Sequence, residues 1–210
     1  MKAIDNLCMA GMNGVLSDTP LKEGINEIVV PENTVFDAKI LHMFGDLSLK
    51  ILLVGNQSKC DVSVVYLSNK NNKYNINIEV IHEHKNTLSN HNVKGVLTDQ
   101  ARLVLNGVIR MRKDSQKCEG FLNHRGILLS ENASVKVTPE LEIFADDVKC
   151  SHGSAVGALD ENQLFYLQTR GIDKTTAQKV LLKAYLSDLL PDAWDEIIDD
   201  WMSANVSEKD

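Results

Sequence analysis

A long succession of short, alternating apolar runs constrains the fold more than any other feature of this sequence. The runs extend from about Ile25 to Ile143 and are broken by Asn, Gly, Asp and Ser, residues that favour turns. In the clearest run, apolar side chains and then two histidines occupy one face of a strand: Ile76, Ile78, Val80, His82 and His84. This pattern predicts a sheet of many brief strands. Because no fixed repeat period is found, a sandwich, a barrel and a β-helix all remain open.

The pattern changes to that of helices beyond about residue 157. Asp160 followed by Gln163 has the form of a capping box, and Gly171 suits the left-handed residue that ends a helix. Asp173 is expected to cap a second helix, and Pro191 to occupy the first turn of a third. Two domains are therefore predicted: a β core of residues 1–158, irregular up to about residue 24, and a helical domain of residues 159–210.

The third predicted helix is the most amphipathic element of the chain and holds both tryptophans. Its apolar residues recur at helical spacing: Trp194, Ile197, Ile198 and Trp201. Such a face either packs onto the protein's own core or docks into the groove of a partner, as amphipathic helices with aromatic anchors do. The sequence leaves both interpretations open.

The formal net charge is −7, from 22 Lys and Arg against 29 Asp and Glu, which argues against a nucleic acid as the main ligand. No run reaches the roughly 18 consecutive apolar residues of a membrane helix, and the start of the chain lacks the pattern of a signal peptide. The four cysteines stand far apart without a C-x-x-C pair, so disulfides are not expected. We expect a cytoplasmic protein that binds neither nucleic acid nor membrane.

Two segments carry a resemblance to a known family. The residues Pro139–Gly153, PELEIFADDVKCSHG, and Leu164–Ile172, LFYLQTRGI, closely resemble the signature of the SufB/SufD family, the scaffold proteins of iron–sulfur cluster assembly. The similarity extends more weakly back through Val104–Ala133 and forward to about Leu190. The Cys-Ser-His-Gly form is more similar to the SufD branch than to the SufB branch.

This resemblance implies a mainly β fold, a right-handed parallel β-helix followed by a small C-terminal helical domain, and so selects among the open architectures. It also implies partners: a SufC-like ABC-type ATPase bound by the helical domain, and a SufB/SufD-like protein or a second copy of the chain at the end of the β-helix. A transient iron–sulfur cluster would be built there with sulfide from a sulfur donor.

Cys150 and His152 are the main candidate ligands. They stand two residues apart, so on a strand their side chains share one face, and thiolate and imidazole are both good ligands for iron. A tetrahedral iron site needs about four donors, so the others must come from a second subunit, from elsewhere in the chain, or from added thiol or sulfide. The alternative is structural: a buried cysteine at a strand end and a histidine in a turn or cap.

Cys118 and His124 are the further candidate ligands. Alignment with the SufB branch places His124 near an essential cysteine of that branch, with Cys118 six residues earlier. For the ATPase, the resemblance points to side chains of the helical domain as the binding surface: Leu164, Phe165, Tyr166, Arg170, Tyr185, Trp194 and Trp201.

The leading hypothesis is a non-enzymatic scaffold subunit, since the sequence has no phosphate-binding loop with which to hydrolyse ATP itself. A second hypothesis is a purely structural partner of the ATPase and scaffold that never holds a cluster. A third is a β-helix metallohydrolase built on His82, His84 and His124, which would need an open coordination position on a zinc ion.

Overall fold

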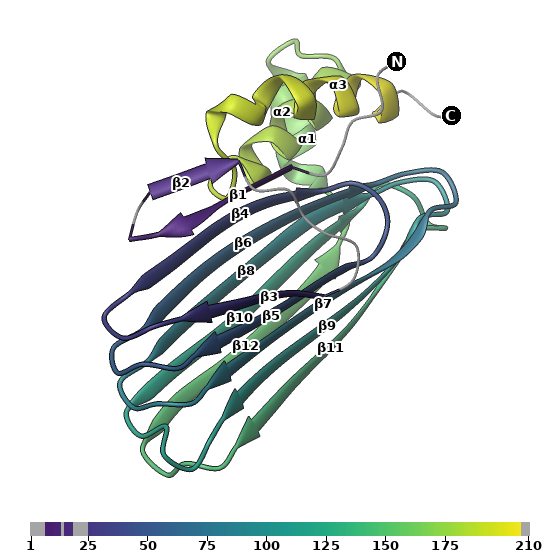
Figure 1. Cartoon of the computed structure of the whole chain (residues 1–210). Helices are drawn as coiled ribbons and strands as arrows, with labels where there is room; N and C mark the ends of the chain where they lie inside the picture. The colour runs from purple at the N-terminus through teal and green to yellow at the C-terminus, as the bar shows by residue number, and fades with distance from the viewer. Residues whose placement is uncertain (1–6, 14, 19–24, 207–210) are drawn as a thin grey trace.

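The computed structural model describes residues 7–13, 15–18 and 25–206, and it shows a parallel β-solenoid of about four turns followed by three α-helices (Figure 1). The predicted mainly β fold, with a parallel β-helix and C-terminal helices, is confirmed. Each turn contributes one strand to each of two sheets, so strands that are adjacent in a sheet come from successive turns.

Among the described residues, the larger sheet has the strand order β12-β10-β8-β6-β4-β1-β2. Its strands are β1 Leu7–Met12, β2 Val15–Asp18, β4 Val35–His42, β6 Lys59–Ser68, β8 Leu88–Leu97, β10 Cys118–Leu128 and β12 Val148–Gly157. The smaller sheet has the order β11-β9-β7-β5-β3. Its strands are β3 Ile25–Val30, β5 Leu47–Leu53, β7 Lys73–His82, β9 Arg102–Met111 and β11 Ser134–Ile143.

The start of the chain departs from the predicted irregular segment. Strands β1 and β2 form an antiparallel hairpin with Met12 opposite Val15, and β1 also pairs antiparallel with β4, placing Ala10 opposite Ala38. The hairpin therefore extends the larger sheet by two strands within the described residues. The rest of the predicted irregular segment, residues 1–6, 14 and 19–24, lies outside the described part of the chain.

The number of residues between paired positions of adjacent strands varies along the chain, which explains why no fixed period is found in the sequence. Along the larger sheet, Ile40 pairs with Val64, Val62 pairs with His91, and Ser89 pairs with Gly120. The separation along the chain increases from the first of these pairs to the last, although all three pairs are direct neighbours in the sheet. The strands keep their register while the connections between them differ in length, so the repeat is regular in space but not along the chain.

Inward-facing side chains of both sheets form the solenoid core, and the alternating burial along β9 is typical. Tyr66 on β6 is fully buried, and its side chain extends across the next two strands of the larger sheet, β8 and β10. A Cβ atom at Gly95 on β8 would overlap the Tyr66 ring, and one at Gly126 on β10 would lie 2.8 Å from the Tyr66 hydroxyl. Two glycines therefore give one large side chain room to span two neighbouring strands.

Replacing Gly95 with alanine is expected to lower the free energy of unfolding by about 1–3 kcal/mol, because the new methyl group overpacks the core against Tyr66. Urea denaturation measures the change. Gly157→Ala is the matched control, since a Cβ atom there meets nothing within 4 Å. Combining Gly95→Ala with Tyr66→Leu should cost less than the sum of the two single changes. Strict additivity would contradict the packing argument.

The helical domain consists of α1 Glu161–Thr169, α2 Lys174–Leu186, a short 3₁₀ segment Asp192–Trp194, and α3 Asp195–Asn205. The predicted caps are present: the Asp160 carboxylate accepts from the Asn162 backbone N–H at 2.8 Å, and the Asp173 carboxylate accepts from that of Thr176 at 2.9 Å. Gly171 has a φ of 85°, the left-handed conformation expected after α1. Pro191 caps the 3₁₀ segment, which runs directly into α3.

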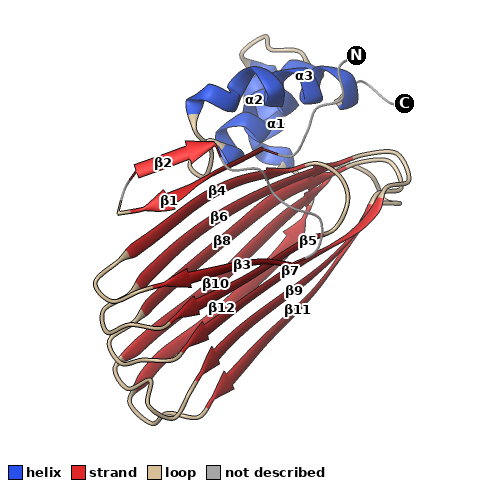
Figure 2. Ribbon diagram, viewed as in Figure 1, coloured by secondary structure: helices blue, strands red, loops and turns tan. Residues whose placement is uncertain are grey.

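The helices pack against one end of the larger sheet (Figure 2). Their apolar residues share a second core with the outward-facing side chains near the ends of β4, β6 and β8: Leu41, Val65, Leu67 and Val96. Trp194 and Trp201 both belong to this core and are each 6% exposed. Of the two interpretations of the amphipathic helix, the structure therefore supports packing onto the protein's own core. No helix in the described part of the chain has the length and apolar character needed to cross a bilayer.

Candidate functional site

The candidate ligands Cys150 and His152 lie on β12, the last strand of the larger sheet. In the parallel register, Cys150 stands beside Gly120 and His152 beside Leu122 of β10. Gly120 and Leu122 are inward-facing, and paired residues of parallel strands point to the same side of a sheet. Both candidate side chains therefore occupy the inner face of the last turn. Among the described strands, β12 pairs with β10 alone, so its other edge is open.

The two side chains differ in exposure. His152 is exposed, whereas Cys150 is partly buried against the apolar cluster of Ile109, Met111, Cys118 and Leu122. Burial raises the pKa of the Cys150 thiol, so the unliganded side chain is protonated at neutral pH. A metal ion must displace that proton to bind the thiolate, which makes any affinity for iron depend on pH.

No group of three or more His, Cys, Asp or Glu side chains in the described residues is arranged to hold a metal ion. Cys150 and His152 thus form at most half of a tetrahedral site within this part of the chain. The edge of β12 is accompanied by exposed apolar residues at the same end of the solenoid: Ile143, Phe144 and Val156. This end combines two candidate ligands with apolar surface of the kind found at protein interfaces.

Cys118 belongs to the apolar cluster against which Cys150 packs, but no third ligand joins Cys150 and His152 in a metal-binding group among the described residues. Cys118 lies on β10 beside Val148, is fully buried, and has its Sγ 2.9 Å from the Thr87 hydroxyl. It also donates to the His84 carbonyl oxygen at 3.1 Å. These contacts hold the thiol in the turn below the last one and occupy its hydrogen-bonding capacity.

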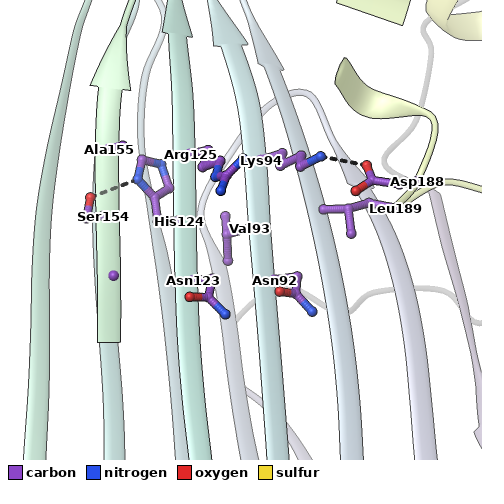
Figure 3. Close-up of a pocket in the computed structure, with 11 residues that line it drawn as sticks. Asn92, Val93, Lys94, Asn123, His124, Arg125, Ser154, Ala155, Asp188 and Leu189 are labelled. Carbon is purple, nitrogen blue, oxygen red and sulfur yellow. Dashed lines mark hydrogen bonds and ion pairs between the residues drawn. The ribbon is translucent and has the colours of Figure 1, made fainter. Parts of the chain in front are cut away.

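His124 is also part of the turn below, and both of its ring nitrogens are engaged. Nε2 lies 2.8 Å from the Tyr66 hydroxyl, and Nδ1 lies 3.1 Å from the Ser154 hydroxyl (Figure 3). Burial lowers the pKa of His124 to about 4, so the ring is neutral at physiological pH. Because Ser154 follows His152 on the same inner face, this chain of hydrogen bonds connects the last turn to the core. Tyr66 and Ser154 cannot be identified from the sequence, because their roles depend on contacts between separate turns of the solenoid.

The predicted grouping of His82, His84 and His124 is wrong. Strand β7 ends at His82, and the turn that follows leaves His84 exposed while His82 is fully buried. His82 places Nδ1 2.7 Å from the Thr87 hydroxyl and Nε2 2.9 Å from that of Ser89. Its ring nitrogens are therefore engaged in a different hydrogen-bond network from that of His124. The three histidines are not grouped so that they could bind one metal ion together.

The side chains predicted to bind a partner divide into two groups. Helix α1 buries none of its residues, and Phe165 and Tyr166 are 68% and 58% exposed. Arg170 lies over the Tyr166 ring at 5.3 Å, and Leu164 is partly buried beside them. Phe165 and Tyr166, with Arg170 at the C-terminal cap, form an exposed aromatic surface on α1.

The other three residues predicted to bind a partner, Tyr185, Trp194 and Trp201, contact their own chain. Trp194 and Trp201 are buried between the helices and the sheet because the outer ends of the strands are themselves apolar. Tyr185 donates from its hydroxyl to the Arg125 carbonyl oxygen at 2.6 Å, and its ring lies 4.9 Å from the Lys94 ammonium. All three join the helical domain to the larger sheet.

The fold and the site together define a class of protein: a parallel β-solenoid with two candidate metal ligands on its last turn and a helical domain packed on one sheet. A family model described as SUF system FeS cluster assembly, SufBD core domain, matches residues 27–185. The chain belongs to this family, as the sequence resemblance indicated.

Several curated relatives are similar to this chain. The iron–sulfur cluster assembly protein SufD of Escherichia coli is 36% identical over 116 residues, which cover 55% of this chain and 27% of that protein. SufD of Bacillus subtilis is 29% identical over 138 residues, 66% of this chain and 32% of the relative. The chloroplastic protein ABCI7 of Arabidopsis thaliana is 29% identical over 147 residues, 70% of this chain and 31% of the relative. The matched segment thus spans about a third or less of each relative.

Proposed function

We propose that this chain is a SufD-like scaffold subunit that holds a nascent iron–sulfur cluster at an interface formed by the last turn of its solenoid. One observation carries the proposal: Cys150 and His152 share the inner face of an edge strand and have no third candidate ligand beside them in the described residues. A partner that covers this end would supply the missing donors. The cluster is the cargo of the complex, and the subunit itself has no catalytic role.

An incomplete ligand set suits a scaffold that must release its product. A site whose ligands come from two subunits loses half of them when the interface opens, so the cluster becomes labile. The raised pKa of the Cys150 thiol acts in the same direction, because protonation competes with the metal for the sulfur. Either a SufB-like protein or a second copy of this chain is a suitable partner, and sulfide would come from a separate sulfur donor.

The exposed aromatic surface on α1 is the proposed docking site for a SufC-like ABC-type ATPase. Phe165 and Tyr166 are large and uncovered, and aromatic side chains of this kind are enriched among the residues that dominate binding energy at interfaces. Because α2 and α3 join the larger sheet through a shared core, movement of a docked ATPase would be transmitted to the solenoid.

The test is iron binding in the reconstituted complex. The chain is purified without oxygen together with a SufC-like ATPase and a SufB-like protein, and iron and sulfide are added. We expect Cys150→Ser plus His152→Ala to lose most of the iron and the visible absorbance of the cluster while the complex stays intact. The control is Cys8→Ser plus His84→Ala, which removes the same two side-chain types outside the last turn and should retain the iron.

Equal iron in the two double variants would remove Cys150 and His152 from the site. A complex that forms normally but holds no iron, even with the wild-type chain, would instead favour a purely structural partner. The partly apolar surroundings of Cys150 are the feature of the structure that agrees with this second function.

A further inference from the structure

A groove on the outer face of the larger sheet has no part in the function proposed above. It has a volume of about 570 Å³ and lies between strands β8, β10 and β12 and the segment that follows α2 (Figure 3). Pockets for small molecules commonly have volumes of about 300 to 1,000 Å³, so the size of this groove suits such a ligand. Cys150 and His152 face the opposite side of β12, because neighbouring residues of a strand alternate between its two faces.

Two cations stand side by side in the groove. Lys94 on β8 is the register partner of Arg125 on β10, and like charges at paired positions repel each other. The positive charge of Lys94 is compensated by Asp188, because the Lys94 ammonium lies 2.6 Å from an Asp188 carboxylate oxygen. The ammonium also donates to the Tyr185 carbonyl oxygen at 2.8 Å. Arg125 has no carboxylate partner within the described residues. With Lys94 and Arg125 positive and Asp188 negative, the lining carries a net charge of +1.

Two asparagines form the next row of the groove. Asn92 and Asn123 are also register partners, and neither side chain has a hydrogen-bond partner in the described part of the chain. On the smaller sheet, the equivalent pair behaves differently, because the Asn106 amide donates to the Asn77 side-chain oxygen at 2.8 Å. The amides in the groove are therefore free to bind another molecule.

Gly153 extends the same row onto the edge strand β12 as the partner of Asn123. A Cβ atom there would meet only the Asn123 side-chain oxygen, at 3.5 Å. The position could therefore accept a side chain without a steric clash. Because glycine has no side chain, the backbone of β12 is open to a ligand at this point. Glycine at this position keeps the groove from being filled.

We propose that this groove binds a small ligand that carries a carboxylate or phosphate group. The Arg125 guanidinium binds the oxyanion through two parallel N–H donors, a geometry that matches both groups. The amides of Asn92 and Asn123 bind the remaining polar atoms, and Ala155 and Leu189, which lie on opposite sides of the groove, contact the carbon skeleton (Figure 3). One bound negative charge neutralises the net charge of the lining.

The test is a calorimetric titration of the purified chain at constant ionic strength with two probes, citrate for carboxylates and AMP for phosphate esters. Saturable binding at one site is expected, with a dissociation constant of about 1 mM or lower. Arg125→Gln should weaken binding at least about tenfold, which corresponds to about 1.4 kcal/mol. Gly153→Leu should weaken it similarly by filling the groove without any change of charge.

Arg102→Gln is the matched control, because Arg102 is an exposed arginine on β9 of the smaller sheet and should not be needed for probe binding. Saturable binding of one probe alone would identify the oxyanion as a carboxylate or a phosphate. The proposal is overturned if neither probe binds, or if Arg102→Gln weakens binding as much as Arg125→Gln does. It is also overturned if binding survives Gly153→Leu in a variant whose thermal unfolding midpoint matches the wild type.

Discussion

Trp201→Ala is expected to lower the free energy of unfolding by about 3–5 kcal/mol, the usual cost of truncating a buried tryptophan. Trp201 is 6% exposed and lies in the core that α2 and α3 share with the outward-facing side chains of the larger sheet. The change leaves a cavity at this junction. Denaturation followed by circular dichroism measures the loss, and hydrogen exchange should locate it in α2 and α3 before the solenoid strands.

Phe165→Ala is the matched control for Trp201→Ala, because it also truncates an aromatic side chain in the helical domain. Phe165 is 68% exposed, so its removal should change the free energy of unfolding by less than about 0.5 kcal/mol. The two variants separate the internal role of one aromatic residue from the proposed docking role of the other. Equal stability of Trp201→Ala and the wild type would contradict the shared core.

Acidification is expected to destabilise the protein strongly between about pH 6.5 and pH 4. Burial lowers the pKa of His82 to about 4 and that of His91 to about 3, the second also through the neighbouring charge of His82. An unfolded histidine has a pKa of about 6.5. As the pH falls below this value, the unfolded state takes up protons that the folded state excludes, so the folded state loses stability. Above about pH 6.5 the contribution is fully present.

The expected slope is up to about 1.4 kcal/mol per pH unit for each of these two histidines. Urea denaturation at several pH values above 5 measures it while most carboxylates are still ionised. His91→Leu is the informative variant, because both ring nitrogens of His91 are buried without a hydrogen-bond partner in the described residues. It should remove the part of the slope that His91 contributes and leave the part due to His82 and His124, whose pKa values burial also lowers. A wild-type stability that is flat between pH 5 and pH 7 would contradict the burial of neutral histidines.

The strand pattern could be predicted from the sequence, but its arrangement could not. Alternation identifies which side chains face inward, and the same alternation fits a sandwich, a barrel or a solenoid. The resemblance to the family selected the solenoid, because connections of variable length hide its repeat. The paired residues Ile40 and Val64 are closer along the chain than Ser89 and Gly120, which are paired in the same way. The register of the strands is set by how the turns stack in space, so it requires no fixed period in the sequence.

The role of the amphipathic third helix could not be decided from the helix alone. A stripe of tryptophan and isoleucine looks the same whether a partner or the protein's own sheet covers it. The informative signal lies in β6, where Val62–Leu67 is almost continuously apolar and the strand is buried on both faces. Such a strand needs cover on its outer side, and the helices supply it.

The candidate site was only partly visible in the sequence. The spacing of Cys150 and His152 predicts a shared strand face, and the register on β10 agrees with it. The failure of the His82 and His84 pair has a local cause, since the strand ends between them and the alternation no longer applies. The groove near Arg125 could not be predicted, because its lining comes from three successive turns that are brought together only by the register of the sheet. Metal binding by Cys150 and His152 stays a prediction.

The unequal number of residues in successive turns has an evolutionary consequence. Among the described parallel strands, β3 to β12, parallel pairing joins only strands of adjacent turns, so the stability of the solenoid is a sum of local contributions in the manner of a modular repeat protein. A whole module inserted or deleted in the middle would leave the geometry of the final strand unchanged. Selection on molecular length and selection on the chemistry at the end of the solenoid can therefore proceed independently, and relatives of very different size can preserve the same terminal residues.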